Sequence, residues 1–205
     1  HEKNSKMAGW EPMWGKDNMV DAALSNGASI LSKDGKTVEI NSDAWVEVWD
    51  SFRSWIHDDK TMKIHSGGQG WEYWYKTIDD VLANKAGGYT GSSGDQADLD
   101  FTKVAAMEQP GWGNNASAPT ADALQLVMLE NSSDEEKQGV YEFMKYFTTA
   151  ENQANWSMNT GYVAVRKSTQ DVEKFKTYAK DHPQALVPLQ QAMHGSILPE
   201  DPTGG

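Results

Sequence analysis

Apolar side chains recur at intervals of three and four residues along much of the chain, which is the spacing of one face of an α-helix. The longest stripe follows Ser42, a favourable helix-capping residue, and predicts a helix with one buried face. Shorter stripes predict helices over residues 19–24, 71–85, 172–179 and 186–193. The longest stripe, which we expect to be core, consists of Trp45, Val48, Trp49, Phe52, Trp55 and Ile56.

Extended segments interrupt this helical pattern. Residues 30–40 predict a β-hairpin, in which two short extended segments flank Asp34-Gly35, a dipeptide that favours tight hairpin turns. Residues 101–107 and 124–129 predict two further strands. Because helices alternate with strands, the pattern predicts an α/β fold in which helices are layered on a sheet.

Two capped helices are predicted between residues 133 and 160. Ser132 and Ser133 each stand three residues before a glutamate, a spacing that lets serine and glutamate satisfy free backbone donors reciprocally. Thr149 offers a second cap, and Gly161 is a typical helix stop. The apolar face of the first of these helices consists of Val140, Phe143, Met144 and Phe147.

The segment after Gly161 reads Gly-Tyr-Val-Ala-Val-Arg-Lys-Ser, up to Ser168. This order of an acidic helix, a short helix with a tryptophan and then this stretch resembles the substrate-binding proteins of ABC importers. The branch of this family that the chain resembles takes up sugars and glycerol phosphates, and it includes the maltodextrin-binding proteins. Here Val163-Ala164 stands where the family usually has Leu-Pro, so the proline that would stiffen the strand is absent.

The resemblance implies a definite architecture. Members of the family have two lobes and about twice this length, so we expect a fragment with the periplasmic-binding-protein type II α/β fold, a mixed β-sheet layered with helices. Residues 1–119 would form the core of the second lobe, and residues 120–168 would return to the first lobe. Residues 169–205 would be a helical return to the second lobe. Apolar groups of residues 120–168 would then be exposed here and would drive association into a dimer or larger assembly.

Composition excludes several classes of protein. The chain carries 18 Lys+Arg against 30 Asp+Glu, a formal charge of -12, which disfavours a nucleic-acid partner. It contains no cysteine, and its histidine pairs lack the spacing of a metal site, so we expect no metal and no cofactor. No nucleophile with its base and no catalytic carboxylate pair is evident, so we expect no enzyme. The acidic pairs, which we expect to be solvated, are Asp58-Asp59, Asp79-Asp80 and Glu135-Glu136.

Three tryptophans are candidate ligand contacts. The resemblance places Trp10 and Trp14 at the ligand cleft, where their rings would stack on the ligand, although both could equally anchor a strand in the core. Trp112 lies between two glycines, so we expect an exposed ring that acts as a stacking residue or a lid.

Hydroxyl groups complete the predicted site. Ser92 and Ser93 lie in a stretch of small residues where hydroxyls and backbone N–H groups could hold ligand oxygens, although it could equally be an ordinary turn. Tyr162 follows the helix-ending glycine, and the resemblance places it at the mouth between the lobes. It would contact ligand there, unless it is buried against Trp156, and Arg166 would mainly brace its own strand.

The function implied by the resemblance is the substrate-binding subunit of an ABC importer. It would capture a carbohydrate between two lobes and deliver it to a membrane permease, outside the cell or in the periplasm, anchored to the membrane as a lipoprotein. The alternative ligand is glycerol-3-phosphate or a glycerophosphodiester, but of the cations only Arg166 and Lys167 lie near a candidate site. An alternative of another class is a glycoside hydrolase or a carbohydrate-binding module.

Overall fold

The computed structural model describes residues 6–65, 71–123 and 125–199. The chain divides into two compact units. The first, here the sheet unit, comprises His1–Ser92, Asp98–Ala121 and His194–Gly205. The second, here the helical unit, comprises Ser93–Ala97 and Asp122–Met193. Among the described residues, no helix has the length and hydrophobicity needed to cross a bilayer.

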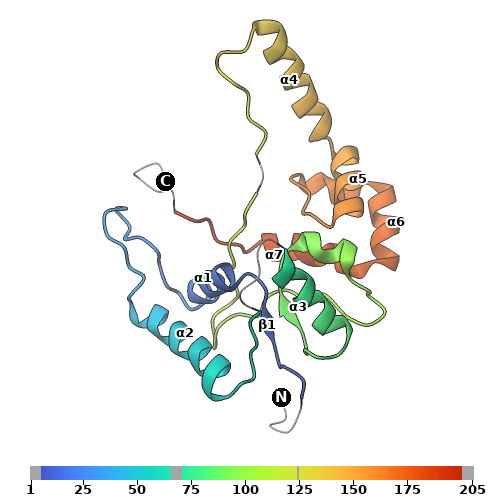
Figure 1. The fold of residues 1–205 in the computed structure, drawn as a ribbon. Coiled ribbons are helices and arrows are strands. Elements are labelled where there is room, and N and C mark those ends of the chain that lie inside the picture. Colours follow the sequence, from blue (N-terminus) through green and yellow to red (C-terminus); the bar gives the residue numbers. More distant parts are fainter. Residues whose placement is uncertain (1–5, 66–70, 124, 200–205) are drawn as a thin grey trace. The chain divides into compact units, whose positions relative to one another are not determined.

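A short parallel ladder lies at the centre of the sheet unit (Figure 1). Strand β1 (Glu11–Pro12) pairs in parallel with β2 (Tyr89–Thr90), and the pairing is extended backwards by a bridge between Ala8 and Ala86. On its other side the same segment forms a parallel bridge between Trp10 and Met62. Residues 8–13 are therefore hydrogen-bonded to chain on both sides, the position of a central strand.

Helices α1 (Gly15–Ser25) and α2 (Asp43–Arg53) enclose the core of the sheet unit. The α2 stripe buries Trp45, Val48 and Phe52, and these pack with Ala23 of α1. The expectation that the whole stripe is core was wrong for Trp49, which is 52% exposed. The apolar face of α2 is therefore narrower than its sequence stripe, and the helix continues as a π-helical turn, η1 (Ser54–Asp58).

The predicted hairpin is confirmed, whereas one predicted strand of the sheet unit is wrong. Leu31 and Val38 form an antiparallel bridge, and Gly35 has a φ of 71°, as a tight turn requires. The predicted helix over residues 71–85 is confirmed as α3 (Glu72–Leu82). Residues 101–107 form turns and irregular chain instead of a strand, and they have no ladder partner among the described residues.

The helical unit takes Ser93–Ala97 from a short 3-10 helix, η2 (Ser93–Asp98), and continues with α4 (Asp134–Phe147) and α5 (Ala150–Thr160). Ser133 and Glu136 form the predicted capping box, and the Thr149 hydroxyl accepts the Asn152 N–H. Gly161 ends α5 with a φ of 77°. These local predictions are confirmed because each depends on residues a few positions apart.

A second, smaller core holds the C-terminal helices together. Residues 167–171 form a 3-10 turn, η3 (Lys167–Asp171), followed by α6 (Glu173–Asp181), a further turn η4 (Pro183–Leu186) and α7 (Val187–Ala192). Ala154, Val172 and Phe175 are buried together, and Phe175 is 1% exposed. Buried Gln153 donates to the Phe147 carbonyl and accepts from the Val165 N–H, each at 3.0 Å. Its side chain therefore connects α5 to the segments that precede and follow this helix.

Two regions of the helical unit leave apolar side chains uncovered. Helix α4 contains no buried residue, and Phe143 is 54% exposed, as we expected for residues 120–168. The predicted strand over residues 124–129 is wrong for the described residues 125–129, which run without a ladder partner and expose Leu126, Val127 and Leu129. Leu124 lies outside the described residues. Whether this exposed surface drives association stays a prediction.

Candidate ligand-binding site

A cavity of about 360 Å³ opens in the sheet unit. Its walls come from β1, α1, α2, η1, β2 and the loop at residues 109–112. Its volume falls within the range of small-molecule sites, which is roughly 300–1,000 Å³. The lining combines three tryptophans with hydroxyl and amide side chains, and no charged residue lines it among the residues that the structure describes.

Trp10 lines this cavity from the central strand. Its Nε1–H donates to the Thr90 hydroxyl at 2.7 Å, so the indole is fixed against β2. A Cβ on Gly88 would lie 2.5 Å from Cζ3 of the same ring, so glycine at position 88 makes room for it. Because its one polar group is satisfied within the protein, Trp10 offers a ligand its apolar surface.

Trp112 lines the same cavity. It lies in a tight turn that is closed by a hydrogen bond from the Asn115 N–H to the Trp112 carbonyl. The expectation of an exposed ring was wrong, because Trp112 is half-buried against Trp55, with ring centroids 5.7 Å apart. Its Nε1–H donates to Glu47 at 3.1 Å. Hydrogen bonds from Trp112 and from Asn26 lower the pKa of the Glu47 carboxyl, so an ionised acceptor holds the ring.

Asn18 adds a polar group that sequence reasoning missed. It lies on α1, lines the cavity and is buried. Its side-chain carbonyl oxygen Oδ1 has no hydrogen-bond partner in the part of the chain that the structure describes. A buried polar atom without a partner is costly, so this oxygen is suited to accept a hydrogen bond from a ligand in the cavity.

The other predicted contacts of the sheet unit do not line this cavity. Trp14 packs edge-to-face on Trp71 and Tyr73, with ring centroids 6.0 and 5.4 Å apart. It belongs to an aromatic cluster at the start of α3. Ser92 follows β2 and is half-buried. Among the predicted residues, the cavity therefore brings together Trp10 and Trp112.

Ser93 and Tyr162 belong to the helical unit. Ser93 begins η2, so the predicted stretch of small residues continues as a 3-10 helix from that residue. The ring of Tyr162 lies against Gly94, where a Cβ would be 2.6 Å from Cζ. Tyr162 is 48% exposed and is therefore not buried, and the cavity it lines within its own unit is only about 10 Å³. Its contact with ligand stays a prediction.

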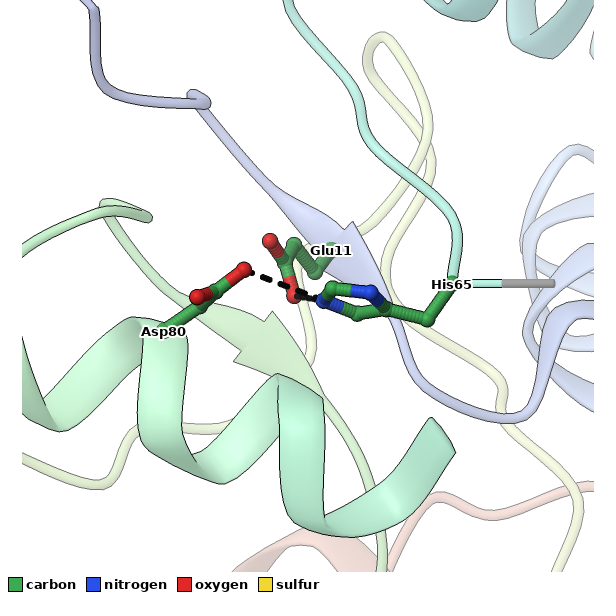
Figure 2. A group of neighbouring side chains, drawn as sticks. All are labelled: Glu11, His65 and Asp80. Atoms are coloured by element: carbon green, nitrogen blue, oxygen red, sulfur yellow. Dashed lines mark hydrogen bonds and ion pairs between the residues drawn. The ribbon is translucent and has the colours of Figure 1, made fainter. Parts of the chain in front are cut away.

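A cluster of titratable side chains is the second feature that sequence reasoning missed. Glu11 of β1, His65 and Asp80 of α3 converge on one point (Figure 2). The expectation that Asp79-Asp80 is solvated was wrong for Asp80, which is buried. Helical spacing offered a signal, because Asp80 lies three residues after Thr77, on the same face of the helix, and Thr77 is also buried.

Burial and charge act in opposite directions in this cluster. Burial raises the pKa of Glu11 above its usual range, and attraction to His65 and Lys63 offsets this only in part. Burial also opposes ionisation of Asp80, but the hydrogen bond from Lys63 and the attraction to Lys63 and His65 outweigh it and lower the pKa of Asp80. The two carboxylates therefore share a compact charged environment.

The fold is that of a solute-binding protein, with an α/β unit that carries a tryptophan-lined cavity. The family model for bacterial extracellular solute-binding proteins matches residues 2–184. The chain therefore belongs to this family. No curated protein sequence matches it significantly.

Solved structures share this fold at low sequence identity. UgpB from Mycobacterium tuberculosis in complex with glycerophosphocholine is 18% identical, with a TM-score of 0.72 over 96% of this chain and 48% of its own. Maltose-bound MalE3 of T. maritima is 18% identical, with a TM-score of 0.74 over 94% and 50%. The GacH receptor of Streptomyces glaucescens is 14% identical, with a TM-score of 0.76 over 96% and 50%. The chain thus spans about half the length of the solved structures it matches.

Proposed function

We propose that this chain is part of the substrate-binding subunit of an ABC importer that captures a neutral carbohydrate. The observation that carries the proposal is the cavity of the sheet unit, which combines Trp10, Trp55 and Trp112 with the unpartnered oxygen of Asn18. Sugar rings present apolar C–H faces and a rim of hydroxyl donors. Tryptophan surfaces suit the former, and an amide oxygen suits the latter.

The charge of the cavity favours a neutral sugar over a glycerol phosphate. A phosphate is recognised by cationic side chains or by convergent backbone N–H groups. In the described part of the chain, no lysine, arginine or histidine lines the cavity. The complex of UgpB with glycerophosphocholine keeps the phosphodiester as the alternative ligand, to be tested beside sugars.

Two lobes would close about a hinge on the captured ligand, and the membrane permease would recognise the closed form. We propose that residues 1–119 form the core of one lobe, that residues 120–168 contact the other, and that residues 169–205 return. The uncovered apolar side chains of α4 and of residues 125–129 support this division. The family supports a site of action outside the cell or in the periplasm, and we propose a lipid anchor for the full-length protein.

Calorimetric titration of the full-length protein with maltose, maltotriose, glycerol-3-phosphate and glycerophosphocholine tests the proposal. We expect saturable sugar binding together with a rise in melting temperature, because a ligand bound only by the native state stabilises it. Saturable binding of a glycerol phosphate alone would replace the sugar by the alternative ligand.

Matched variants locate the binding site. Trp112→Ala should weaken sugar binding by about 1–3 kcal/mol, the scale of a lost aromatic contact at a binding site. Trp49→Ala is the control, since Trp49 lies on α2 in the same unit, is 52% exposed and does not line the cavity. Asn18→Leu should weaken binding without lowering the melting temperature, because no protein partner of its Oδ1 is lost. Equal effects of Trp112→Ala and Trp49→Ala would move the site elsewhere.

The hydrolase alternative makes a different forecast. A glycoside hydrolase releases reducing sugar from oligosaccharides, and the release stops when a catalytic carboxylate is replaced. We expect the full-length protein to return bound oligosaccharide unchanged after prolonged incubation. Product release that is lost in a single Asp→Asn or Glu→Gln variant would establish the enzyme instead.

A further inference from the structure

Three potential metal ligands from three separate segments meet beside the central strand of the sheet unit (Figure 2). His65 Nε2 lies 3.0 Å from an oxygen of Asp80 and 3.3 Å from an oxygen of Glu11. One ligand atom from each residue lies within 4.8 Å of both others. Tetrahedral zinc with bonds of about 2.0–2.1 Å separates its ligands by roughly 3.3 Å, and both distances from His65 Nε2 are near this spacing.

Glu11 is the member that a purely structural ion-pair network explains least well. Its side chain is 1% exposed, and neither carboxylate oxygen meets the geometry of a hydrogen bond with the described residues. Its ionic contacts are His65 at 3.3 Å and Lys63 Nζ at 3.6 Å. A buried carboxylate held so loosely is costly, and a closer cation would remove that cost.

The cluster is separate from the ligand cavity. Trp10 and Pro12 line the cavity, and Glu11 lies between them on β1. Successive side chains of a strand point to opposite faces, so Glu11 points away from the cavity. The two sites therefore share a strand but use its two faces.

Two lysines already supply positive charge to the cluster. Lys63 Nζ contacts Asp80, and Lys85 Nζ lies 3.7 Å from the other oxygen of Asp80. Both lysines are partly exposed, at 45% and 67% of the side chain. A flexible, half-exposed ammonium can turn outwards to water when another cation takes its position.

We propose that Glu11, His65 and Asp80 bind a divalent transition-metal ion of the zinc type, in competition with the Lys63 ammonium. One imidazole nitrogen and two carboxylate oxygens are ligands that zinc accepts, and a water molecule completes four-coordination. Spacing along the chain does not reveal this site, because the ligands lie far apart, at positions 11, 65 and 80. The ion cross-links three segments of the sheet unit: β1, the segment that ends at His65, and α3. It therefore stabilises the unit that carries the cavity.

Titration of the EDTA-treated full-length protein with zinc chloride tests the site. We expect one equivalent of zinc to bind with a rise in melting temperature, since a metal bound only by the folded state stabilises it. His65→Gln should lower the affinity at least ~10-fold, a loss that even an outer ligand partner causes. His194→Gln is the matched control, because His194 Nε2 also faces a carboxylate, Glu108, at 2.9 Å but belongs to no group of three potential ligands among the described residues.

Two further measurements keep the result unambiguous. Asp80→Asn repeats the test at a second ligand, and circular dichroism of both variants checks that they fold. Lys63→Met should raise the zinc affinity, because it removes the competing ammonium and leaves the three ligands. Zinc binding that is unaffected by His65→Gln and Asp80→Asn in folded variants overturns the site. Weaker binding to Lys63→Met than to wild type overturns the competition and, with it, the proposed position of the ion.

Discussion

The sheet unit and the helical unit reach stability by different means. The sheet unit buries a core between α1 and α2, together with polar groups such as Glu11, Asp21 and Asp80. The helical unit buries a smaller apolar cluster around Phe175 and leaves α4 without a buried residue. Its first helix is supported instead by local devices, among them a capping box and an ion pair between Lys145 and Glu142.

The two units also differ in how far apart in the sequence their contacting residues lie. Many contacts of the helical unit join elements that follow one another along the chain, such as α4 with α5 and α6 with η4, so they depend largely on local patterns. The cavity and the charged cluster of the sheet unit join residues that are tens of positions apart, and Trp10 and Trp112 are the clearest example. The unit that is easier to predict is thus not the unit in which the candidate site lies.

Truncation of Phe175 gives the largest expected effect and tests whether the small core controls the helical unit. Phe175→Ala should lower the free energy of unfolding of this unit by about 3–5 kcal/mol, because it deletes a fully buried ring. Urea denaturation followed by circular dichroism measures the loss. Phe143→Ala, on the half-exposed face of α4, should cost under about 0.5 kcal/mol. Equal costs for the two variants would mean that α4 is buried in the full-length protein.

Replacement of Tyr162 tests whether the helical unit also contributes to ligand binding. The side chain is half-exposed and packs on Gly94, so its loss should affect stability little. If it contacts ligand as the resemblance implies, Tyr162→Ala weakens sugar binding by about 1–3 kcal/mol, the scale of a lost hydrogen bond with stacking. Calorimetry on the full-length protein gives the affinity. An unchanged affinity would leave the sheet unit as the sole source of contacts in this chain.

The parts of the fold that were predictable from sequence are those with local causes. The Asp34-Gly35 turn, the Ser133 capping box and the Gly161 helix stop were each predicted and found. The strands predicted over residues 101–107 and 124–129 were not found in the described residues. A strand requires a hydrogen-bonded neighbour, and these segments have none among the described residues, so propensity alone could not form them.

The candidate site was predictable only in part, for a related reason. Trp10 and Trp112 could be proposed because tryptophan is a distinctive residue for ligand stacking. Asn18 and Asp80 could not, since a polar residue in a helix looks the same in sequence whether it faces water or a cavity. The burial of Glu11 was even harder to predict, because a lone glutamate in a strand is ordinarily expected at the surface.

Asp21 tests how the sheet unit tolerates a buried charge. Its Oδ1 accepts the N–H and the hydroxyl of Thr120, both at 2.8 Å, across 99 positions of sequence. Asp21→Ala should destabilise by about 1–3 kcal/mol, because it leaves the Thr120 N–H without a partner. Asp21→Asn keeps an acceptor oxygen and removes the charge. Thermal unfolding of both variants against wild type measures the difference.

The pH dependence of Asp21→Asn follows from the raised pKa of Asp21. Burial raises this pKa, and the hydrogen bonds from Thr120 offset that only in part. The folded protein therefore holds the proton more tightly than the unfolded chain, and stability falls as pH rises from the unfolded pKa of about 3.9 through the folded value. The stability of Asp21→Asn minus the stability of wild type should therefore be larger at about pH 7 than at about pH 3. A difference that does not change with pH would show that Asp21 titrates normally.

The smallest expected effect tests whether α4 depends on its own sequence. The Ser133 hydroxyl accepts the Glu136 N–H at 3.2 Å, and the Glu136 carboxylate accepts the Ser133 N–H at 2.8 Å. Ser133→Ala should cost about 1 kcal/mol, and the loss should appear as faster hydrogen exchange in the first turns of α4. Ser132→Ala is the matched control, since the neighbouring serine stands at the same spacing from Glu135 but is not the cap. Because α4 buries no residue in this chain, the melting temperature should hardly change. A clear fall in melting temperature for Ser133→Ala alone would show that α4 is coupled to the rest of the fold, which would remove the contrast between a locally stabilised helix and a packed sheet unit.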